Sequence, residues 1–298
     1  MLSMARRLGD ASRWLYVLPA LLLVVVFVYY PAVDNLRLSF FSWSSFSPKE
    51  AFVGLQNYRD LAADPIFWGA LFNNVAYAVV SVIFQVGGGL VLAAILEEFV
   101  APRLRGFFRT VFFIPAVMSL TVVGFLFYFL YEPNFGLVNQ AMTAIGLGSF
   151  THAWLGEEST AIWSIIAMSQ WQSFGYVMVL FIVAIQKIPR ELYEAAYIDG
   201  ASKIQAFRRI TVPLVFDMTE LMLIVTVSGA FLVFNEVWVM TQGGPNNASH
   251  TLGSWLYKSG FFNDQLGYAA AIGAVIFVIT FAASALQLSL RRGRTVQF

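Results

Sequence analysis

Six long apolar stretches, separated by more polar connections, dominate the amino-acid sequence. Five of them contain no charged residue, and the other carries acidic residues only near its two ends. A helix needs roughly 20 apolar residues to cross the hydrocarbon core of a bilayer, and each stretch reaches that length. The sequence therefore predicts six membrane-spanning segments, at residues 14–33, 66–96, 110–131, 161–186, 215–241 and 266–290.

The composition agrees with a chain that resides in lipid. Of the 298 residues, 59% are hydrophobic and 12% are charged, whereas soluble domains carry about 25% charged residues. Backbone groups in lipid must be hydrogen-bonded within the chain, so the six segments are predicted to be helices. We expect an all-α membrane protein with one transmembrane domain spanning residues 1–298. The absence of cysteine excludes disulfides and thiolate metal sites, and a net charge of +1 argues against a nucleic-acid partner.

The distribution of lysine and arginine predicts the orientation, because cytoplasmic connections are enriched in these residues. Four of the 18 lie in one set of connections, namely Arg37, Lys49, Arg59 and Lys258. The other fourteen lie in the opposite set, which holds both termini: Arg6, Arg7, Arg13, Arg103, Arg105, Arg109, Lys187, Arg190, Lys203, Arg208, Arg209, Arg291, Arg292 and Arg294. Both termini are therefore predicted to be cytoplasmic, with the first span kept as an uncleaved signal anchor.

The connection between the fourth and fifth spans, residues 188–213, is the most charged stretch of the chain. Pro189 suits a helix start, and Glu191 in the first turn is favoured by the helix dipole. Gly200 can end that helix, and Asp199 is expected to cap a second helix that begins near Ala201. The pattern predicts two short helices at the membrane surface. Taken by itself, such a loop could equally be a solvated connection between two spans.

Several sequence motifs resemble one family of membrane proteins. In the 188–213 loop, Glu194-Ala195-Ala196, Asp199-Gly200-Ala201 and Ile210-Thr211-Val212-Pro213 resemble the EAA loop of binding-protein-dependent ABC importer permeases. The other matching motifs are Gly54-Leu55-Gln56-Asn57-Tyr58 after the first span, Phe113-Ile114-Pro115 in the third, and Thr241-Gln242-Gly243-Gly244-Pro245 after the fifth. Together they are similar to the carbohydrate-uptake branch, with its MalF-type and UgpA-type subunits. The large external domain of some MalF subunits is missing, since the first external loop has only about 32 residues.

This resemblance implies a fold, a mechanism and partners. The fold would be the MetI-like, type I importer permease with six spans. The 188–213 loop would be a coupling helix that docks on an ATP-binding subunit, and the residues implied in coupling are Glu191, Glu194, Ala195, Ala196, Asp199, Gly200 and Phe207. The implied partners are a second homologous permease subunit, a dimer of ATP-binding subunits, an extracytoplasmic sugar-binding protein and the lipid bilayer. The implied location is the cytoplasmic (inner) membrane of a bacterium or archaeon.

The motifs that are missing from the chain restrict its chemistry. No glycine-rich loop followed by Gly-Lys-Ser/Thr is present, so ATP must be hydrolysed by another polypeptide. We therefore expect no catalytic residue, no metal site and no cofactor in this chain, with ATP and magnesium held by the ATP-binding subunits. The two histidines, His152 and His250, lie in external loops and are expected at the surface.

Polar residues within the spans are candidates for a sugar pathway, because sugars need hydrogen-bonding groups in the bundle interior. Such groups equally often hold neighbouring helices together, and both interpretations stay open here. For Glu236, solvation or pairing with a partner subunit is the leading interpretation. The candidate pathway residues are Ser119, Ser169, Gln172, Ser173, Tyr176, Thr226, Asn235 and Glu236.

The sequence thus predicts the permease subunit of an ATP-driven importer for a sugar, such as a disaccharide or oligosaccharide. Within the class, an importer for glycerol 3-phosphate, its diesters or a polyol is the alternative. Residues 110–131, 161–186 and 215–241 contain no lysine or arginine, which favours a neutral sugar over a phosphate. A secondary transporter would usually show internal repeats and buried carboxylates, and we find no such repeat. An intramembrane enzyme is disfavoured by the missing catalytic motifs.

Overall fold

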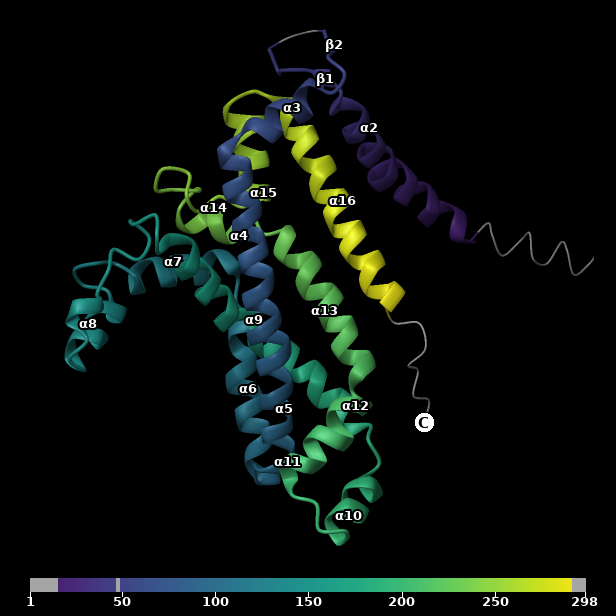
Figure 1. Cartoon of the computed structure of the whole chain (residues 1–298), viewed down its shortest axis with the longest axis vertical. Coiled ribbons are helices and arrows are strands. Elements are labelled where there is room, and N and C mark those ends of the chain that lie inside the picture. Colours follow the sequence, from purple (N-terminus) through teal and green to yellow (C-terminus); the bar gives the residue numbers. More distant parts are fainter. Residues whose placement is uncertain (1–15, 47–48, 291–298) are drawn as a thin grey trace, which may run out of the picture. The chain divides into compact units, whose positions relative to one another are not determined.

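The computed structural model describes residues 16–46 and 49–290. Almost all regular structure in these residues is helical, and a two-stranded antiparallel hairpin pairs Phe41 with Phe52 (Figure 1). Trp14, which opens the first predicted span, lies outside the described residues, as do the terminal arginines used to predict the orientation. The predicted all-helical fold is confirmed.

The secondary-structure elements follow in chain order. The strands are β1 (Phe41–Ser42) and β2 (Ala51–Phe52). The α-helices are α2 (Tyr30–Leu38), α3 (Gln56–Ala63), α4 (Pro65–Ser81), α5 (Gly89–Glu98), α6 (Pro102–Val117), α7 (Leu120–Leu130), α8 (Leu137–Ala144), α9 (Ala161–Gln186), α10 (Arg190–Ile198), α11 (Lys203–Ala206), α12 (Val212–Leu214), α13 (Phe216–Phe231), α14 (Asn235–Met240), α15 (Leu252–Tyr257) and α16 (Leu266–Leu290). Four π-helical segments are η1 (Val25–Tyr29), η2 (Val82–Gly88), η4 (Phe207–Thr211) and η5 (Lys258–Phe262), and η3 (Gly148–Phe150) is a 3-10 turn.

Among the described residues, four helices are individually long and apolar enough to cross a membrane: Tyr16–Leu38, Pro65–Glu98, Ala161–Gln186 and Leu266–Ser289. The second of these, called span 2 below, is one helix made of α4, η2 and α5. The predicted limits of the second, fourth and sixth spans agree with these helices within two residues. Hydropathy alone located them because each is a single uninterrupted apolar helix.

The third and fifth spans are broken, and the prediction of continuous helices over 110–131 and 215–241 is wrong. The third consists of α6 and α7, which meet at an angle of 95° around Met118 and Ser119. In the fifth, α13 ends at Phe231 and α14 begins at Asn235, so the predicted helix is interrupted between them. The 203–214 segment that precedes α13 meets it at an angle of 68°. The carbonyls freed at such breaks need new donors, because lipid supplies none.

The described chain divides into two compact units, and the first comprises residues 16–63 and 256–275. Its organising side chain is Asn57 of the Gly54–Tyr58 motif, whose amide donates to the carbonyls of Ser39 and Phe41 at 2.8 and 2.9 Å. A Cβ on Gly267 would collide with the Phe41 carbonyl, so this glycine permits close packing at the hairpin. The motif therefore holds the β1–β2 hairpin in place.

The second unit, residues 64–255 and 276–290, holds the main core, where span 2 packs on α9. Buried Ala93, Met178 and Phe181 form its centre. A Cβ on Gly88 would lie 2.9 Å from the Phe174 ring, and one on Gly89 would lie 3.3 Å from the Met178 amide. These two glycines therefore permit the close packing of span 2 on α9.

Candidate functional site

The 188–213 loop forms two helical parts that separate at Gly200, as predicted. Gly200 has a φ of +81°, a left-handed conformation that glycine adopts at little cost. The amide of Ala201 donates to the carbonyl of Ala196 at 2.9 Å, and that of Gly200 donates to Tyr197 at 3.1 Å. This pair of bonds is the Schellman motif, which satisfies the last carbonyls of α10. Gly200 therefore sets the angle at which the chain leaves α10.

The prediction that Asp199 caps the second helix is wrong. Asp199 is the residue that ends α10, and the N-cap of α11 is Ser202. The Ser202 hydroxyl accepts from the Gln205 amide at 3.3 Å, and the Gln205 side chain accepts from the Ser202 amide at 2.7 Å. This reciprocal capping box has a sequence signature, Ser-x-x-Gln, that was available for the prediction. The left-handed turn at Gly200 delays the next helix until Lys203.

The residues predicted to couple the loop to an ATPase fall into two groups. Phe207 is half-buried and packs against the core shared by span 2 and α9, together with Tyr193. Ile198, which follows the Glu-Ala-Ala run, has 86% of its surface exposed. The group that faces solvent, with Ala196 partly covered, consists of Glu191, Glu194, Ala195, Ala196, Asp199 and Gly200. The first helix of the loop thus exposes small and acidic residues.

A cavity of about 810 Å³ lies between the end of span 2 and this loop. Val91 and Ile95 line it from span 2, and Tyr193, Tyr197 and Phe207 line it from the loop. The cavity means that the loop does not pack continuously against the end of span 2. Glu98, Tyr197 and Lys203 also line the cavity, in addition to the apolar packing of Tyr193 and Phe207 on the core.

The eight candidate pathway residues differ in their exposure. Within the described chain, no side chain of the eight hydrogen-bonds to another of them. The buried ones are Ser169, Gln172 and Thr226, the half-buried ones are Ser173 and Glu236, and the exposed ones are Ser119, Tyr176 and Asn235. Exposed positions in a single subunit are available to a partner subunit or to a ligand.

Gln172 has a structural contact that the sequence did not reveal. Its side-chain amide donates to the carbonyl of Met118 at 3.1 Å, where the third span breaks between α6 and α7. This bond supplies a donor to a carbonyl that the bend leaves outside the helical ladder. Gln172 therefore supports the bend in addition to any contact with a substrate.

Tyr77 of span 2 belongs with the candidate pathway residues, although it was not selected among them. Its side chain is only 3% exposed, and its hydroxyl makes no hydrogen bond to another described group. A buried hydroxyl without a partner is costly. The only sequence signal was a phenol within an apolar span.

Other polar residues of the spans join helices, so the alternative interpretation is confirmed for them. The Gln85 amide donates to Gln170 at 2.9 Å, and Gln170 donates to Ser81 at 3.1 Å, which links span 2 to α9. Asn73 donates to the carbonyls of Ala248 and His250, both at 2.8 Å. The two bonds of Asn73 satisfy carbonyls of an irregular segment. Such carbonyls must be hydrogen-bonded within the chain, because lipid supplies no donors.

Asn74 makes a similar pair of bonds to the segment that follows the fifth span. Its amide donates to the Ala230 carbonyl at 2.6 Å, and its oxygen accepts from the Leu252 amide at 2.8 Å. The hydroxyl of Thr251 donates to the Val233 carbonyl at 2.7 Å. Together these side chains satisfy the backbone where α13 ends.

His250 was expected at the surface, and this expectation is wrong. Its side chain is fully buried, with Nδ1 2.9 Å from the Ser254 hydroxyl and its ring 5.3 Å from that of Trp255. Gly243 of the Gly-Gly-Pro motif has a φ of +87°, and a Cβ there would collide with the His250 ring. The motif therefore places Gly243 against the ring of a buried histidine that follows seven residues later in the chain.

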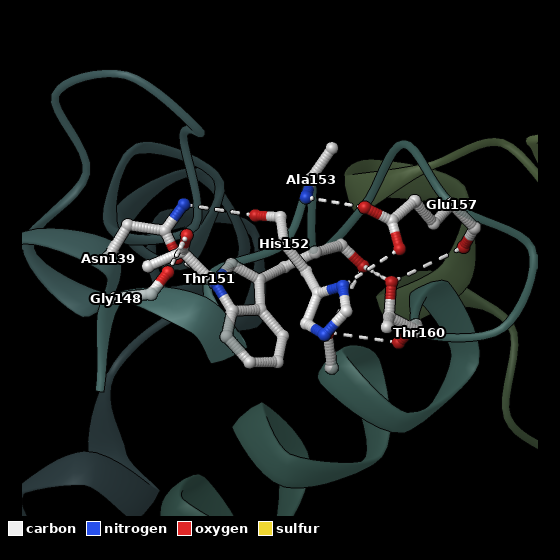
Figure 2. Close-up of polar contacts among 9 residues, drawn as sticks. Asn139, Gly148, Thr151, His152, Ala153, Glu157 and Thr160 are labelled. Atoms are coloured by element: carbon white, nitrogen blue, oxygen red, sulfur yellow. Dashed lines mark hydrogen bonds and ion pairs between the residues drawn. The ribbon is translucent and has the colours of Figure 1, made fainter. Parts of the chain in front are cut away.

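His152 is exposed, as expected, and belongs to an ordered loop after α8 (Figure 2). Its Nδ1 lies 3.0 Å from Glu157, whose other oxygen accepts from the Ala153 amide at 2.9 Å. Hydrogen bonding to the Ala153 amide, with a smaller contribution from His152, lowers the pKa of Glu157. Asn139 donates to the His152 carbonyl at 3.0 Å (Figure 2). Its side-chain oxygen accepts from the Trp154 indole at 2.7 Å. This network shapes the loop without forming a metal site among the described residues.

Known proteins with similar sequences cover nearly the whole chain. "Probable ABC transporter permease protein YurN" of Bacillus subtilis is 53% identical over 92% of this chain and 94% of its own length. "Lactose transport system permease protein LacF" of Rhizobium radiobacter is 35% identical over 98% of both chains.

Solved structures and a family description agree with these sequence relatives. A chain of the bacterial alginate ABC transporter, crystallised with a periplasmic protein carrying alginate pentasaccharide, matches with a TM-score of 0.83 over 95% of both chains. At 20% identity this likeness concerns the fold, and it confirms the predicted importer-permease architecture. Residues 85–296 match the description "Binding-protein-dependent transport system inner membrane component". The chain therefore belongs to the family of inner-membrane components of binding-protein-dependent transport systems.

Proposed function

We propose that this chain is one of two permease subunits of an ATP-driven importer for a disaccharide or oligosaccharide. The observation that carries the proposal is the 188–213 loop, whose two helices are set by Gly200 in a left-handed conformation. Such a loop offers a docking element, with exposed Ile198, Glu194 and Ala195, to another protein. Relatives named for lactose and arabinooligosaccharide transport support a sugar as substrate.

The working unit would combine this chain with a second permease, two ATP-binding subunits and an extracytoplasmic sugar-binding protein. ATP and magnesium would be held by the ATP-binding subunits, because this chain contains no glycine-rich phosphate-binding motif. With both termini in the cytoplasm, the 188–213 loop faces the ATP-binding subunits and the loops around α8 and α14 face the binding protein. Closure of the ATP-binding dimer would then move the loop and turn the permease from inward- to outward-facing.

Replacing Gly200 with proline tests the coupling role of the loop. Proline fixes φ near −65°, whereas Gly200 has a φ of +81°. We expect Gly200→Pro to insert and assemble, but to lose sugar-stimulated ATPase activity and uptake in proteoliposomes that contain the complete transporter. Gly200→Asn is the matched control, because asparagine tolerates the left-handed region, and it should retain both activities. Normal stimulated ATPase activity in the proline variant would refute the proposal for this loop.

We further propose that the sugar passes the polar groups of spans three to five, beside the buried Tyr77. The double variant Gln172→Ala, Ser173→Ala should lower uptake about tenfold, as expected for lost hydrogen bonds to a ligand, with a smaller effect on assembly. Gln172 also supports the Met118 bend, so Ser173→Ala alone separates the two roles. Ser173 has no hydrogen bond to another described residue, so its replacement tests a ligand contact without removing the support of the bend. Unchanged uptake by the double variant would remove α9 from the pathway.

A further inference from the structure

Glu98, the last residue of span 2, is bonded to both helical parts of the 188–213 loop. The Tyr197 hydroxyl of α10 donates to a Glu98 carboxylate oxygen at 2.8 Å. The Lys203 ammonium of α11 donates to the Glu98 carbonyl at 3.1 Å and lies 3.5 Å from its carboxylate. The same ammonium lies 4.5 Å from the centre of the Phe99 ring, within the range of a cation–π interaction. One residue thus contacts the loop on both sides of Gly200.

The protonation of Tyr197 suits this contact. Burial and the nearby Glu98 carboxylate raise the pKa of Tyr197 to about 12. The phenol is therefore protonated at neutral pH and acts as the donor, while Glu98 acts as the acceptor. The bond between them is charge-assisted, which makes it stronger than a bond between neutral groups.

The neighbouring Glu97 fixes the other elements at this end of the helix. Its carboxylate pairs with Arg109 and lies 3.4 Å from both Arg105 and the Gln186 side chain. Arg105 and Arg109 belong to α6, and Gln186 ends α9. Glu97 therefore bonds to α6 and α9, whereas the adjacent Glu98 bonds to the 188–213 loop.

Glu98, Tyr197 and Lys203 all line the 810 Å³ cavity. Tyr193 and Phe207 of the loop also pack against the core that span 2 and α9 share. Where the cavity separates the end of span 2 from the loop, the bonds of Glu98 add polar links between them.

The opposite end of the same helix is bonded to a second irregular segment. Asn73 and Asn74 hold the backbone of residues 230–252 through the four hydrogen bonds described above. No break interrupts the helix between Asn73 and Glu98. Span 2 therefore connects the 188–213 loop to the 230–252 segment, both of which lie in the same compact unit.

We propose that Glu98 is a positioning residue for energy coupling: through Tyr197 and Lys203 it makes span 2 move with the 188–213 loop. Through Asn73 and Asn74, span 2 then transmits this movement to the 230–252 segment. The role in coupling rests on the proposed function, whereas the mechanical link is a property of the chain itself. An experiment can therefore refute the role in coupling without refuting the mechanical link, or the reverse.

The first experiment measures coupling in the complete transporter reconstituted in proteoliposomes. The double variant Tyr197→Phe, Lys203→Gln should transport about tenfold less sugar per ATP hydrolysed, the change expected when hydrogen bonds to a charged group are lost. The matched control is Tyr128→Phe, Arg103→Gln, at an exposed tyrosine and arginine that make no side-chain hydrogen bond to described residues. A double variant with the parent's ratio of sugar to ATP would overturn the proposal.

The second experiment measures the link without any partner protein. The chain contains no cysteine, so spin labels can be placed at Ile198→Cys and Phe84→Cys, which are 86% and 56% exposed. In the detergent-solubilised permease, the distance distribution between the labels should be narrow in the parent and the control, and broad in the double variant. A broad parent distribution, or a double variant as narrow as the parent, would overturn the link. An absence of sugar-stimulated uptake in the parent transporter would instead refute the proposed function, with the label measurement still deciding the link.

Discussion

Replacing Gly175 with alanine is expected to prevent stable folding of the helical core. A Cβ at this position would collide with the Phe112 carbonyl, with its carbon 2.5 Å away and the Phe113 Cα 3.0 Å away. All of these are backbone atoms, so no side chain can rotate to make room, and α6 would have to move away from α9. Overpacking of this kind costs roughly 3 kcal/mol or more. The measurement is the free energy of unfolding of the detergent-solubilised permease, together with its level in membranes.

Gly69→Ala is the matched control for Gly175→Ala. Gly69 also lies within a helix, but no atom lies within 4 Å of a Cβ built there. Alanine has a higher helix propensity than glycine by about 1 kcal/mol, so this variant should be as stable as the parent or more stable. Equal stability of the two variants would contradict the close approach of α6 and α9.

Replacing Asn74 with leucine should release the segment that follows α13. The side chain is fully buried and satisfies one carbonyl and one amide, those of Ala230 and Leu252. Leucine has a similar volume but no polar atom, so both backbone groups lose their partner. Each unsatisfied buried group costs about 1–3 kcal/mol, which gives a loss of roughly 2–6 kcal/mol in unfolding free energy. Hydrogen exchange at the Leu252 amide should rise with it.

Gln140→Leu serves as the control, because Gln140 is exposed and donates a single hydrogen bond, to the Phe135 carbonyl. It should change the unfolding free energy by less than about 1 kcal/mol. If Asn74→Leu were as stable as this control, the two bonds of Asn74 would not hold the 230–252 segment.

The limits of the second, fourth and sixth spans followed from hydropathy because each is a single helix, whereas the first was predicted to end at residue 33 and its helix continues to Leu38. The breaks of the third span at Met118–Ser119 and of the fifth span after Phe231 were missed because the residues there are as apolar as those of the straight spans. The side chains that make these breaks tolerable lie elsewhere in the sequence. Gln172 contacts Met118 from 54 residues away, and Asn74 contacts Ala230 from 156 residues away. A local sequence pattern does not identify hydrogen-bond donors that lie so far away in the chain.

The loop at 188–213 was predictable because its signals are local. Gly200 favours the end of a helix, and Glu191 favours its first turn, and both residues lie within the loop itself. The cap of α11 was assigned to Asp199 rather than Ser202 because the length of the turn after Gly200 was not anticipated. Glu98 was missed for a different reason: its partners Tyr197 and Lys203 lie about 100 residues away. Their contact depends on the packing of span 2 beside the loop.

The continuity of span 2 has a consequence for its position in the bilayer. Its 34 residues correspond to about 51 Å at 1.5 Å per residue, whereas the hydrocarbon core of a bilayer is about 30 Å thick. The helix therefore has a positive hydrophobic mismatch, which tilt or cover by neighbouring protein must absorb. A thicker membrane reduces this mismatch, so the helix is better matched to thick bilayers than to thin ones.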